Sequence, residues 1–259
     1  MNSLANKVVV IIGGTSGIGL SAAKACIASG AKVVATGVGD SVDSAKKELG
    51  TDAVVLDADT TDPGSSDKAI SVAIDTFGGF DALYHVAGGS GRRFGDGKLH
   101  SATDEGIQKT LELNLTSVLY SNRAALRYFI ENKQTGTIVN LTSVLASSPS
   151  PEHFGTSVYA TAKAGIIGLT KNLAANYASA NIRVNAIAAG LVDTPMSSRA
   201  QSDATIMDYI KNKQPLDGGR IGTPEDLDAL VVYLLSYESR IVTGQVIAVD
   251  GGWSVSEGH

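Results

Sequence analysis

Cysteine is almost absent from this sequence, aromatic residues are few, and acidic residues outnumber basic ones. The single cysteine, Cys26, excludes an internal disulfide bond and fits a reducing compartment. With 5% aromatic residues and a net charge of −5 at pH 7, the chain gives no reason to expect a nucleic acid or an anionic membrane as partner. It shows no signal or transit peptide and no long apolar span, so we expect a cytoplasmic protein without a membrane partner.

Histidine is scarce as well. The four histidines are His85, His100, His153 and His259, and they show no spacing typical of metal ligands. We therefore expect no metal site.

What the sequence does contain is a regular alternation of short apolar runs and helical stretches. Strands are predicted at 7–12, 32–36, 53–57, 81–86, 136–142, 182–188 and 245–249. Helices are predicted at 17–29, 41–49, 65–77, 103–131, 157–179 and 224–236. This alternation indicates an α/β protein with a doubly wound, seven-stranded parallel sheet covered by helices on both faces, in three layers. No repeat or linker divides the chain, so residues 1–259 are predicted to form one domain.

One stretch interrupts this alternation. Residues 191–222 are polar and weakly periodic, and they follow a strand end, where parallel sheets bind their ligands. We expect them to form a mobile lid over a substrate; the alternative is a surface excursion that packs against a neighbouring subunit.

The first predicted strand runs into a glycine-rich turn. Gly13, Gly17 and Gly19 give it the spacing G-x-x-x-G-x-G, and a helix follows. Glycines let the backbone approach a pyrophosphate closely, and the N-terminus of a helix offers free N–H groups and a partial positive charge. The strand before the turn and the helix after it favour a dinucleotide site over an ordinary tight turn.

Tyr159 and Lys163 lie four residues apart in a predicted helix, which places both side chains on one face. A phenol with a pKa of roughly 10 is a poor acid–base group at neutral pH. A nearby ammonium stabilises the phenolate, so Lys163 is expected to lower the pKa of Tyr159 toward the working range. The same spacing also arises by chance as a surface pair.

With these motifs in this order, the sequence resembles the compact, single-domain branch of the short-chain dehydrogenase/reductase family over nearly its whole length. The residues that match the family's glycine motif, its adenine-side Asp and its catalytic Asn, Ser, Tyr and Lys are Gly13, Gly17, Gly19, Asp59, Asn114, Ser143, Tyr159 and Lys163. The stretches IRVNAIAAGLVDTPM and TGQVIAVDGG resemble the cofactor-binding segment after the sixth strand and the last strand of the family. The resemblance implies a Rossmann fold and an NAD(P)-dependent oxidoreductase.

The resemblance also implies roles for the four catalytic positions in hydride transfer between nicotinamide and an alcohol or carbonyl carbon. Tyr159 would give a proton to the developing alkoxide, or take one from the alcohol. Lys163 would lower the Tyr159 pKa and bind the nicotinamide ribose, Ser143 would hold the substrate oxygen, and Asn114 would support a water that feeds Lys163. From the residues alone, Ser143 is also a possible cap for the next segment, and Asn114 a partner of a neighbouring carbonyl.

A larger set of positions is expected to bind the cofactor. These are Gly13, Thr15, Ser16, Gly17, Ile18, Gly19, Gly37, Val38, Asp59, Thr60, Ala87, Gly88, Tyr159, Lys163, Gly190, Val192 and Thr194. Thr194 has a second interpretation, because Thr194-Pro195 is also typical of a helix start.

The chain departs from the family pattern at several places outside the four catalytic positions. The usual Asn-Asn-Ala-Gly after the fourth strand reads His85-Val86-Ala87-Gly88 here. Ile12 replaces a Thr, Ala189 replaces a Pro, and residues 147–155 include an insertion beside the expected active site. These differences concern the positioning of the cofactor and the class of substrate.

The choice of cofactor depends on the end of the second strand. A carboxylate there binds the ribose hydroxyls of NAD, whereas a basic residue binds the 2′-phosphate of NADP. Gly37 and Val38 occupy these two positions, Thr15 and Ser16 supply no cation, and Asp40 is near in sequence. NAD is therefore favoured over NADP.

Three residues near the expected site have open roles. Arg92 and Arg93 follow the fourth strand and either steer an acidic substrate or lie in a solvated loop. His153, in the insertion, is a candidate substrate contact.

The two long predicted helices, at 103–131 and 157–179, carry more apolar residues than one buried face needs. Together with the resemblance, this surplus predicts a homotetramer; the alternative is that the lid and loops cover it. As to function, an alcohol dehydrogenase or carbonyl reductase is the leading hypothesis, and a catalytically silent dinucleotide-binding sensor is the alternative. Reduction of a carbon–carbon double bond is disfavoured, because that branch of the family spaces its Tyr and Lys more widely.

Overall fold

The structure, a computed structural model, describes residues 3–258. Its centre is a parallel sheet of seven strands in the order β3-β2-β1-β4-β5-β6-β7. The strands are β1 (Val8–Ile12), β2 (Lys32–Gly37), β3 (Ala53–Asp57), β4 (Ala82–His85), β5 (Gly136–Ser143), β6 (Ile182–Ala189) and β7 (Val246–Val249). The order reverses between β1 and β4, which is where such sheets bind ligands. The doubly wound Rossmann sheet predicted from the sequence is confirmed.

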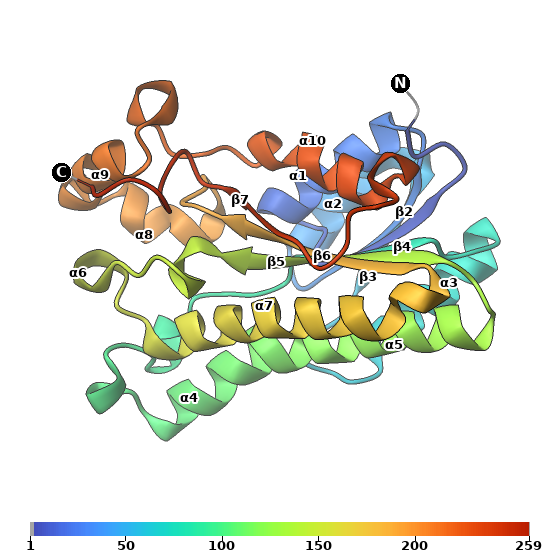
Figure 1. Cartoon of the computed structure of the whole chain (residues 1–259), viewed down its shortest axis with the longest axis horizontal. Helices are drawn as coiled ribbons and strands as arrows, with labels where there is room; N and C mark the ends of the chain where they lie inside the picture. Colours follow the sequence, from blue (N-terminus) through green and yellow to red (C-terminus); the bar gives the residue numbers. More distant parts are fainter. Residues whose placement is uncertain (1–2, 259) are drawn as a thin grey trace.

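Helices cover both faces of this sheet (Figure 1). One face carries α3 (Ser65–Phe77), α5 (Ser117–Glu131) and α7 (Ser157–Tyr177), and the other carries α1 (Gly17–Ala28), α2 (Ser41–Leu49) and α10 (Glu225–Leu235). Two apolar cores fill the space between the layers.

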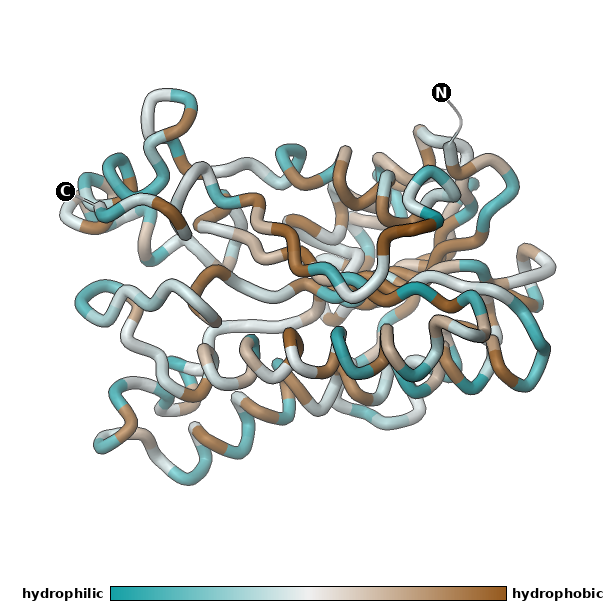
Figure 2. The backbone as a smooth tube through the Cα atoms, viewed as in Figure 1, coloured by the Kyte–Doolittle hydropathy of each residue, from teal (hydrophilic) through white to brown (hydrophobic). Residues whose placement is uncertain are grey.

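Strand β1 shows how one sequence serves both cores. Val9 and Ile11 pack into the core under α1 and α10, whereas Val8, Val10 and Ile12 pack into the core under α3 and α5. Successive side chains of a strand point to opposite faces, so an unbroken apolar run is what a doubly covered strand requires. Figure 2 shows that hydrophobic residues lie along the central strands and hydrophilic residues at the outer turns.

The helix predicted over 103–131 is interrupted. Helix α4 (Asp104–Leu111) passes into a π-helical turn at Glu112–Thr116, and α5 then continues the same direction. Such turns insert one extra residue into a helix and are frequent at functional sites. Asn114 lies inside this turn and is buried.

Short helices gather at the carboxyl ends of the strands, at the left in Figure 1. They are α6 (Pro151–Phe154), α8 (Ser198–Gln201) and α9 (Ala204–Lys213). A third apolar cluster holds them together and consists of Val144, Ala200, Ile206, Ile210 and Trp253. The region 191–222 is therefore more helical than its sequence suggested, and its closing as a lid stays a prediction.

Cys26 is buried, and its burial, with a smaller contribution from Asp228, raises the thiol pKa to about 12, which agrees with an unreactive core cysteine. Within residues 3–258, no helix has the length and apolar character that crossing a bilayer requires, and no group of His, Cys, Asp and Glu side chains has the arrangement of a metal site.

Candidate active site

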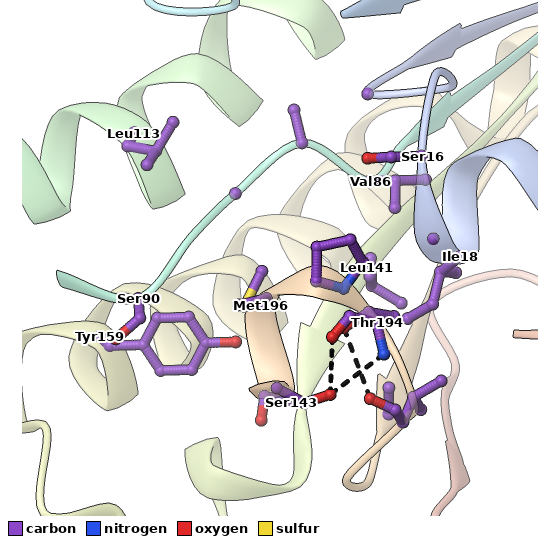
Figure 3. A pocket seen from close by; sticks show the side chains of 18 of the residues that line it. Ser16, Ile18, Val86, Ser90, Leu113, Leu141, Ser143, Tyr159, Thr194 and Met196 are labelled. Atoms are coloured by element: carbon purple, nitrogen blue, oxygen red, sulfur yellow. Dashed lines mark hydrogen bonds between the residues drawn. The ribbon is translucent and has the colours of Figure 1, made fainter. Parts of the chain in front are cut away.

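A pocket of about 730 Å³ opens at the carboxyl ends of the strands. Figure 3 shows residues from several elements around it: Ser16 and Ile18 from the glycine turn, Ser143 from the end of β5, and Tyr159 from α7. Most of the residues that the sequence assigned to a cofactor line it, namely Gly13, Thr15, Ser16, Gly17, Ile18, Gly37, Val38, Asp59, Thr60, Ala87, Gly88, Tyr159, Gly190, Val192 and Thr194. Gly19 and Lys163 do not line it, and neither does the catalytic candidate Asn114.

The glycine turn forms the floor of one half of the pocket. Gly13 has φ +87°, and a Cβ atom there would lie 2.6 Å from the backbone N of Ala87. A Cβ on Gly19 would lie 1.9 Å from the carbonyl O of Gly13. The missing Cβ of Gly13 thus lets the turn pack against the loop after β4, and that of Gly19 lets the helix start pack beneath the turn.

The adenine side of the predicted site contains an unpartnered polar atom. The Oγ1 atom of Thr60 is buried without a hydrogen-bond partner, and Thr60 and Asp59 both line the pocket. Because a buried hydroxyl without a partner is unfavourable, Thr60 fits a ligand that supplies one. These observations fit a dinucleotide, which Gly13, Asp59 and Thr60 would hold.

At the end of β2, Gly37 has no room for a side chain. A Cβ there would lie 1.8 Å from Oγ1 of Thr15, and that hydroxyl is 2.8 Å from the Ser41 hydroxyl. Asp40, which the sequence suggested as a nearby charge, is not among the lining residues. This end of the pocket therefore presents hydroxyl groups, Asp59 and no basic side chain.

Tyr159 points into the pocket from α7 (Figure 3). Its burial raises the phenol pKa to about 12, and a hydrogen bond with Ser143 opposes that rise. Ser143 also accepts a hydrogen bond of 3.2 Å from the backbone N of Leu145, so its predicted cap role and its contact with Tyr159 occur together. The phenol keeps its proton at neutral pH and is a proton donor as it stands.

The expected effect of Lys163 on this phenol is not what the structure shows. The Lys163 Nζ atom lies 5.6 Å from the centre of the Tyr159 ring and donates a 3.0 Å hydrogen bond to the carbonyl O of Leu141. Burial lowers the Lys163 pKa to about 8, so most of this amine still carries its proton at neutral pH. The sequence-based prediction of a lowered Tyr159 pKa is wrong for this arrangement, because burial raises the phenol pKa and only the hydrogen bond with Ser143 opposes the rise.

Asn114 and Lys163 meet behind the loop that follows β4. A Cβ on Gly88 would lie 2.9 Å from Oδ1 of Asn114 and 3.4 Å from Nζ of Lys163. The Asn114 amide donates to the carbonyl oxygens of Gly89 and Thr110, each at 3.0 Å, and its Oδ1 atom accepts from the N–H of Gly89. Asn114 thus fastens this loop to the π-helical turn, and its bond to Thr110 agrees with the carbonyl-partner alternative.

His85 replaces an Asn of the family pattern and is fully enclosed behind the same loop. Its Nε2 atom is 3.2 Å from the carbonyl O of Ala87, which can only accept, so Nε2 carries the proton. Its Nδ1 atom is 2.7 Å from the hydroxyl of Ser121. The neutral imidazole therefore links the loop after β4 to α5.

Thr194 caps a short helix beside the glycine turn. It begins the helix Pro195–Ser197 in a capping box with Ser197, as the Thr-Pro pattern indicated. Its methyl group lies 3.0 Å from where a Cβ of Gly17 would be. Its contact with a pyrophosphate stays a prediction.

The outer half of the pocket includes residues that the sequence did not reveal. These are Phe94, Phe154, Met196, Arg199 and Trp253. No local pattern marks them, because they come from separate short elements that meet only in the fold. The His153 ring is not among the lining residues and instead lies 4.5 Å from the Tyr209 ring, so its prediction as a substrate contact is wrong for this structure. Arg92 and Arg93 do line the pocket.

Comparison with known proteins gives matches over nearly the full chain. The model of a family described as enoyl-(acyl carrier protein) reductase matches residues 13–254. A 3beta-hydroxysteroid dehydrogenase 1 of Eggerthella lenta is 34% identical over 262 residues, 99% of this chain and 97% of the relative. A cis-4-hydroxycyclohexanecarboxylate dehydrogenase of Sinomonas cyclohexanicum is 32% identical over 255 residues, 97% of this chain and 98% of the relative.

A solved structure shows the same arrangement. The 3-ketoacyl-(acyl-carrier-protein) reductase of Brucella melitensis, complexed with NADH, has a TM-score of 0.85 at 28% identity and covers 97% of this chain and 100% of its own. Family, sequence and structural matches thus agree with the motifs and the sheet order. The chain belongs to the short-chain dehydrogenase/reductase family, and it is an oxidoreductase.

Proposed function

We propose that the protein interconverts an alcohol and a carbonyl group, with a nicotinamide cofactor carrying the hydride and Tyr159 carrying the proton. The observation that supports this most directly is the place of Tyr159, whose phenol points into the same pocket that Ser143 and the glycine turn line. The cofactor supplies the hydride when bound. All four catalytic positions of the family are present, so no observation favours the silent sensor.

Tyr159, Ser143 and Lys163 have separate proposed roles toward the proton and the substrate oxygen. Tyr159 donates its proton to the alkoxide that develops when a carbonyl is reduced, and accepts one in the reverse direction. Ser143 holds the same oxygen with its hydroxyl, at the point where negative charge grows. Burial lowers the Lys163 pKa to about 8, so the amine titrates just above neutral pH and is suited to move a proton as well as to hold a ribose hydroxyl.

NAD is the proposed cofactor. The end of the pocket that Thr15, Gly37, Val38 and Asp59 line presents no cation to a 2′-phosphate. The NADH complex of the Brucella melitensis reductase shows that a protein of this fold takes that cofactor. Both observations favour NAD over NADP.

The proposed substrate class is a secondary alcohol or the matching ketone. The relatives are named for hydroxysteroid and hydroxycyclohexanecarboxylate oxidation and for ketoacyl reduction. The matching family is described by enoyl reduction, yet the four-residue spacing of Tyr159 and Lys163 is the one expected for carbonyl chemistry. We also propose a homotetramer in the cytoplasm, with small molecules as its partners.

A substrate panel tests the proposed function. Purified protein is given steroid alcohols, alicyclic alcohols, sugars and oxoacyl thioesters with each nicotinamide cofactor, and the cofactor absorbance is followed. We expect turnover of at least one alcohol–ketone pair and none of an enoyl thioester. Turnover of the enoyl thioester alone would move the protein to the other reaction class.

A further inference from the structure

Two arginines at the mouth of the pocket converge on one backbone oxygen. Arg92 donates to the carbonyl O of His153 at 3.4 Å, and Arg199 donates to the same oxygen at 3.2 Å. The two come from segments more than a hundred residues apart, and the oxygen belongs to the short helix α6. The fold thus holds two like charges side by side.

Neither arginine of this pair forms an ion pair within the described part of the chain. Among the ion pairs of residues 3–258, none includes Arg92 or Arg199. Both side chains are exposed, and each guanidinium gives one of its several N–H donors to His153, so the other donors are open to solvent or to a ligand. Partial burial and then the charge of Arg199 lower the pKa of Arg92, and the charge of Asp96 opposes this.

Charged side chains of both signs lie near the pair or line the same pocket. The charge of Asp96 acts on Arg92, and both Asp96 carboxylate oxygens also accept hydrogen bonds from backbone N–H groups of α7. Arg93 stacks on Phe94 and adds a further positive charge. Glu112 also lines the pocket, and no ion pair within residues 3–258 joins it to either arginine.

The pair is within reach of the reacting end of the pocket. Both arginines line the same pocket as Tyr159. Arg92 follows Ser90 by two residues and Arg199 follows Met196 by three, and Ser90, Met196 and Tyr159 share the view of the pocket in Figure 3. Apolar side chains, among them Leu113, Phe154 and Trp253, also line this pocket.

We propose that Arg92 and Arg199 bind the carboxylate of a substrate whose carbon skeleton is otherwise apolar and whose alcohol or ketone reaches Tyr159. This rests on the proposed function, because it names the substrate class of that reaction. The planar guanidinium group of an arginine has paired N–H donors that match the two oxygens of a carboxylate. With both arginines around one site, a fully charged carboxylate would take the place of the single carbonyl O that they share. An anion held there also fixes the distance of the reacting carbon from Tyr159, which orients it for the proton and hydride.

Matched acid and ester pairs test the proposal through turnover. 4-Oxocyclohexanecarboxylate and its methyl ester differ in charge and keep the ring. We expect kcat/KM to favour the acid, and Arg199→Gln and Arg92→Gln each to lower this preference about 10- to 100-fold, mainly through KM. Arg199→Lys keeps the charge without the fork and should fall between the two. Arg240→Gln, at an exposed arginine outside the pocket, is the matched control. Equal losses for acid and ester would overturn the proposal.

Binding without turnover separates this proposal from the proposed function. Calorimetry with cyclohexanecarboxylate and with cyclohexanecarboxamide, in the presence of NADH, needs no reaction. We expect the carboxylate to bind more tightly, and this difference to disappear in Arg92→Gln/Arg199→Gln. If the difference is present and no alcohol is oxidised, the anion site stands and the proposed function fails. If the two compounds bind equally, the anion site is rejected whatever the enzyme turns over.

A phosphate-bearing substrate is the remaining source of an anion. Acetoacetyl-coenzyme A brings its phosphates to the pocket mouth and has no carboxylate. If the arginine variants lower kcat/KM for this thioester and leave the oxo acid unchanged, the carboxylate assignment is wrong.

Discussion

The carboxylate of Asp96 holds the first turn of the helix that carries Tyr159. Its two oxygens accept hydrogen bonds from the backbone N–H groups of Val158, at 3.0 Å, and of Tyr159 itself, at 2.9 Å. Asp96 is buried and lies in the loop between β4 and α4, far from Tyr159 in sequence. A negative charge at a helix N-terminus satisfies N–H groups that have no partner within the helix. Tyr159, the proposed general acid, is therefore positioned through its own backbone.

Replacing Asp96 with Ala should lower both stability and turnover. Two buried N–H groups at the start of α7 lose their acceptor, which costs about 1–3 kcal/mol for each unsatisfied group. Movement of this turn displaces the Tyr159 hydroxyl, so we expect kcat to fall while the dissociation constant for the nicotinamide cofactor stays near that of the wild type. Denaturant unfolding, steady-state kinetics and cofactor titration measure the three quantities.

A core variant controls for lost stability. Ile70→Val removes one methyl group from the core beneath α3, outside the pocket, and costs about 0.5–1.5 kcal/mol. Its kcat should stay near wild type at a temperature where both proteins are folded. If Asp96→Ala also keeps a normal kcat there, Asp96 stabilises the fold and does not position Tyr159.

Tyr159→Phe keeps the ring and removes only the hydroxyl. Without the proton donor, turnover should fall by about 10²–10⁴-fold, whereas folding and cofactor binding should stay near wild type. Circular dichroism and cofactor titration serve as the controls. A variant that kept a tenth of the activity would show that another group moves the proton.

His85 should make the protein less stable in mild acid. Burial, and then the charge of Lys163, lower its pKa to about 3 in the folded state, against about 6.5 in an unfolded chain. Between these two values the unfolded state binds a proton that the folded state does not, so the free energy of unfolding falls as pH falls, by about 1.4 kcal/mol per pH unit once below the unfolded pKa.

The matched variant for this effect is His85→Asn, which keeps a polar group and cannot titrate. Urea unfolding at about pH 7.5 and about pH 5 compares the two proteins. We expect a steeper loss for the wild type, by about 1–2 kcal/mol over this interval. Parallel pH profiles would mean that His85 is protonated in the folded state.

The cofactor preference should respond to a cation at position 38. Val38 is 57% exposed and lines the adenine side of the pocket, where a longer side chain has room. Val38→Arg gives a 2′-phosphate a charged partner, worth about 1.5–3 kcal/mol, so the dissociation constant for NADP should fall. Val38→Gln supplies length without charge. A wild-type protein that already binds NADP more tightly than NAD would contradict the proposed cofactor.

The apolar surplus on the long helices predicts assembly. Leu119 and Ile130 of α5 are 44% and 46% exposed, and Ile167 and Leu169 of α7 are half-buried. These two helices cover the same face of the sheet (Figure 1). We expect a tetramer of D₂ symmetry, and light scattering at micromolar concentration should give about four times the chain mass. A mass near the 26.6 kDa of one chain would leave this surface without a partner.

The strands and their surroundings were the most predictable part of the fold. The strand predicted at 7–12 is observed at Val8–Ile12, and the one predicted at 136–142 at Gly136–Ser143. A strand buried on both faces must be apolar throughout, so its sequence carries the signal directly. The same holds for the glycine turn, because Gly13 and Gly19 have no space for a Cβ atom.

What the sequence did not reveal depends on contacts between distant segments. Helix α9 had a local signal, since Asp203 caps it and Ile206 and Ile210 are spaced for one face, but the polar residues around them obscured it. The bond from Tyr159 to Asp96 spans 63 positions, and no local pattern reports such a pair. The direction of the Tyr159 pKa was missed for a related reason, because the degree of burial follows from the whole fold.

Helix α4, the π-helical turn at Glu112–Thr116 and α5 form one continuous helix. Because of the turn, the number of residues in this helix matters for its geometry as much as their identity. In an α-helix each residue advances the direction of the side chain by about 100°. Deleting one residue there would restore regular winding and turn α4 by that angle relative to α5. Asn114 would then no longer meet Gly89, although every remaining residue would be unchanged. Insertions and deletions in this helix should therefore be less tolerated than substitutions on its exposed side.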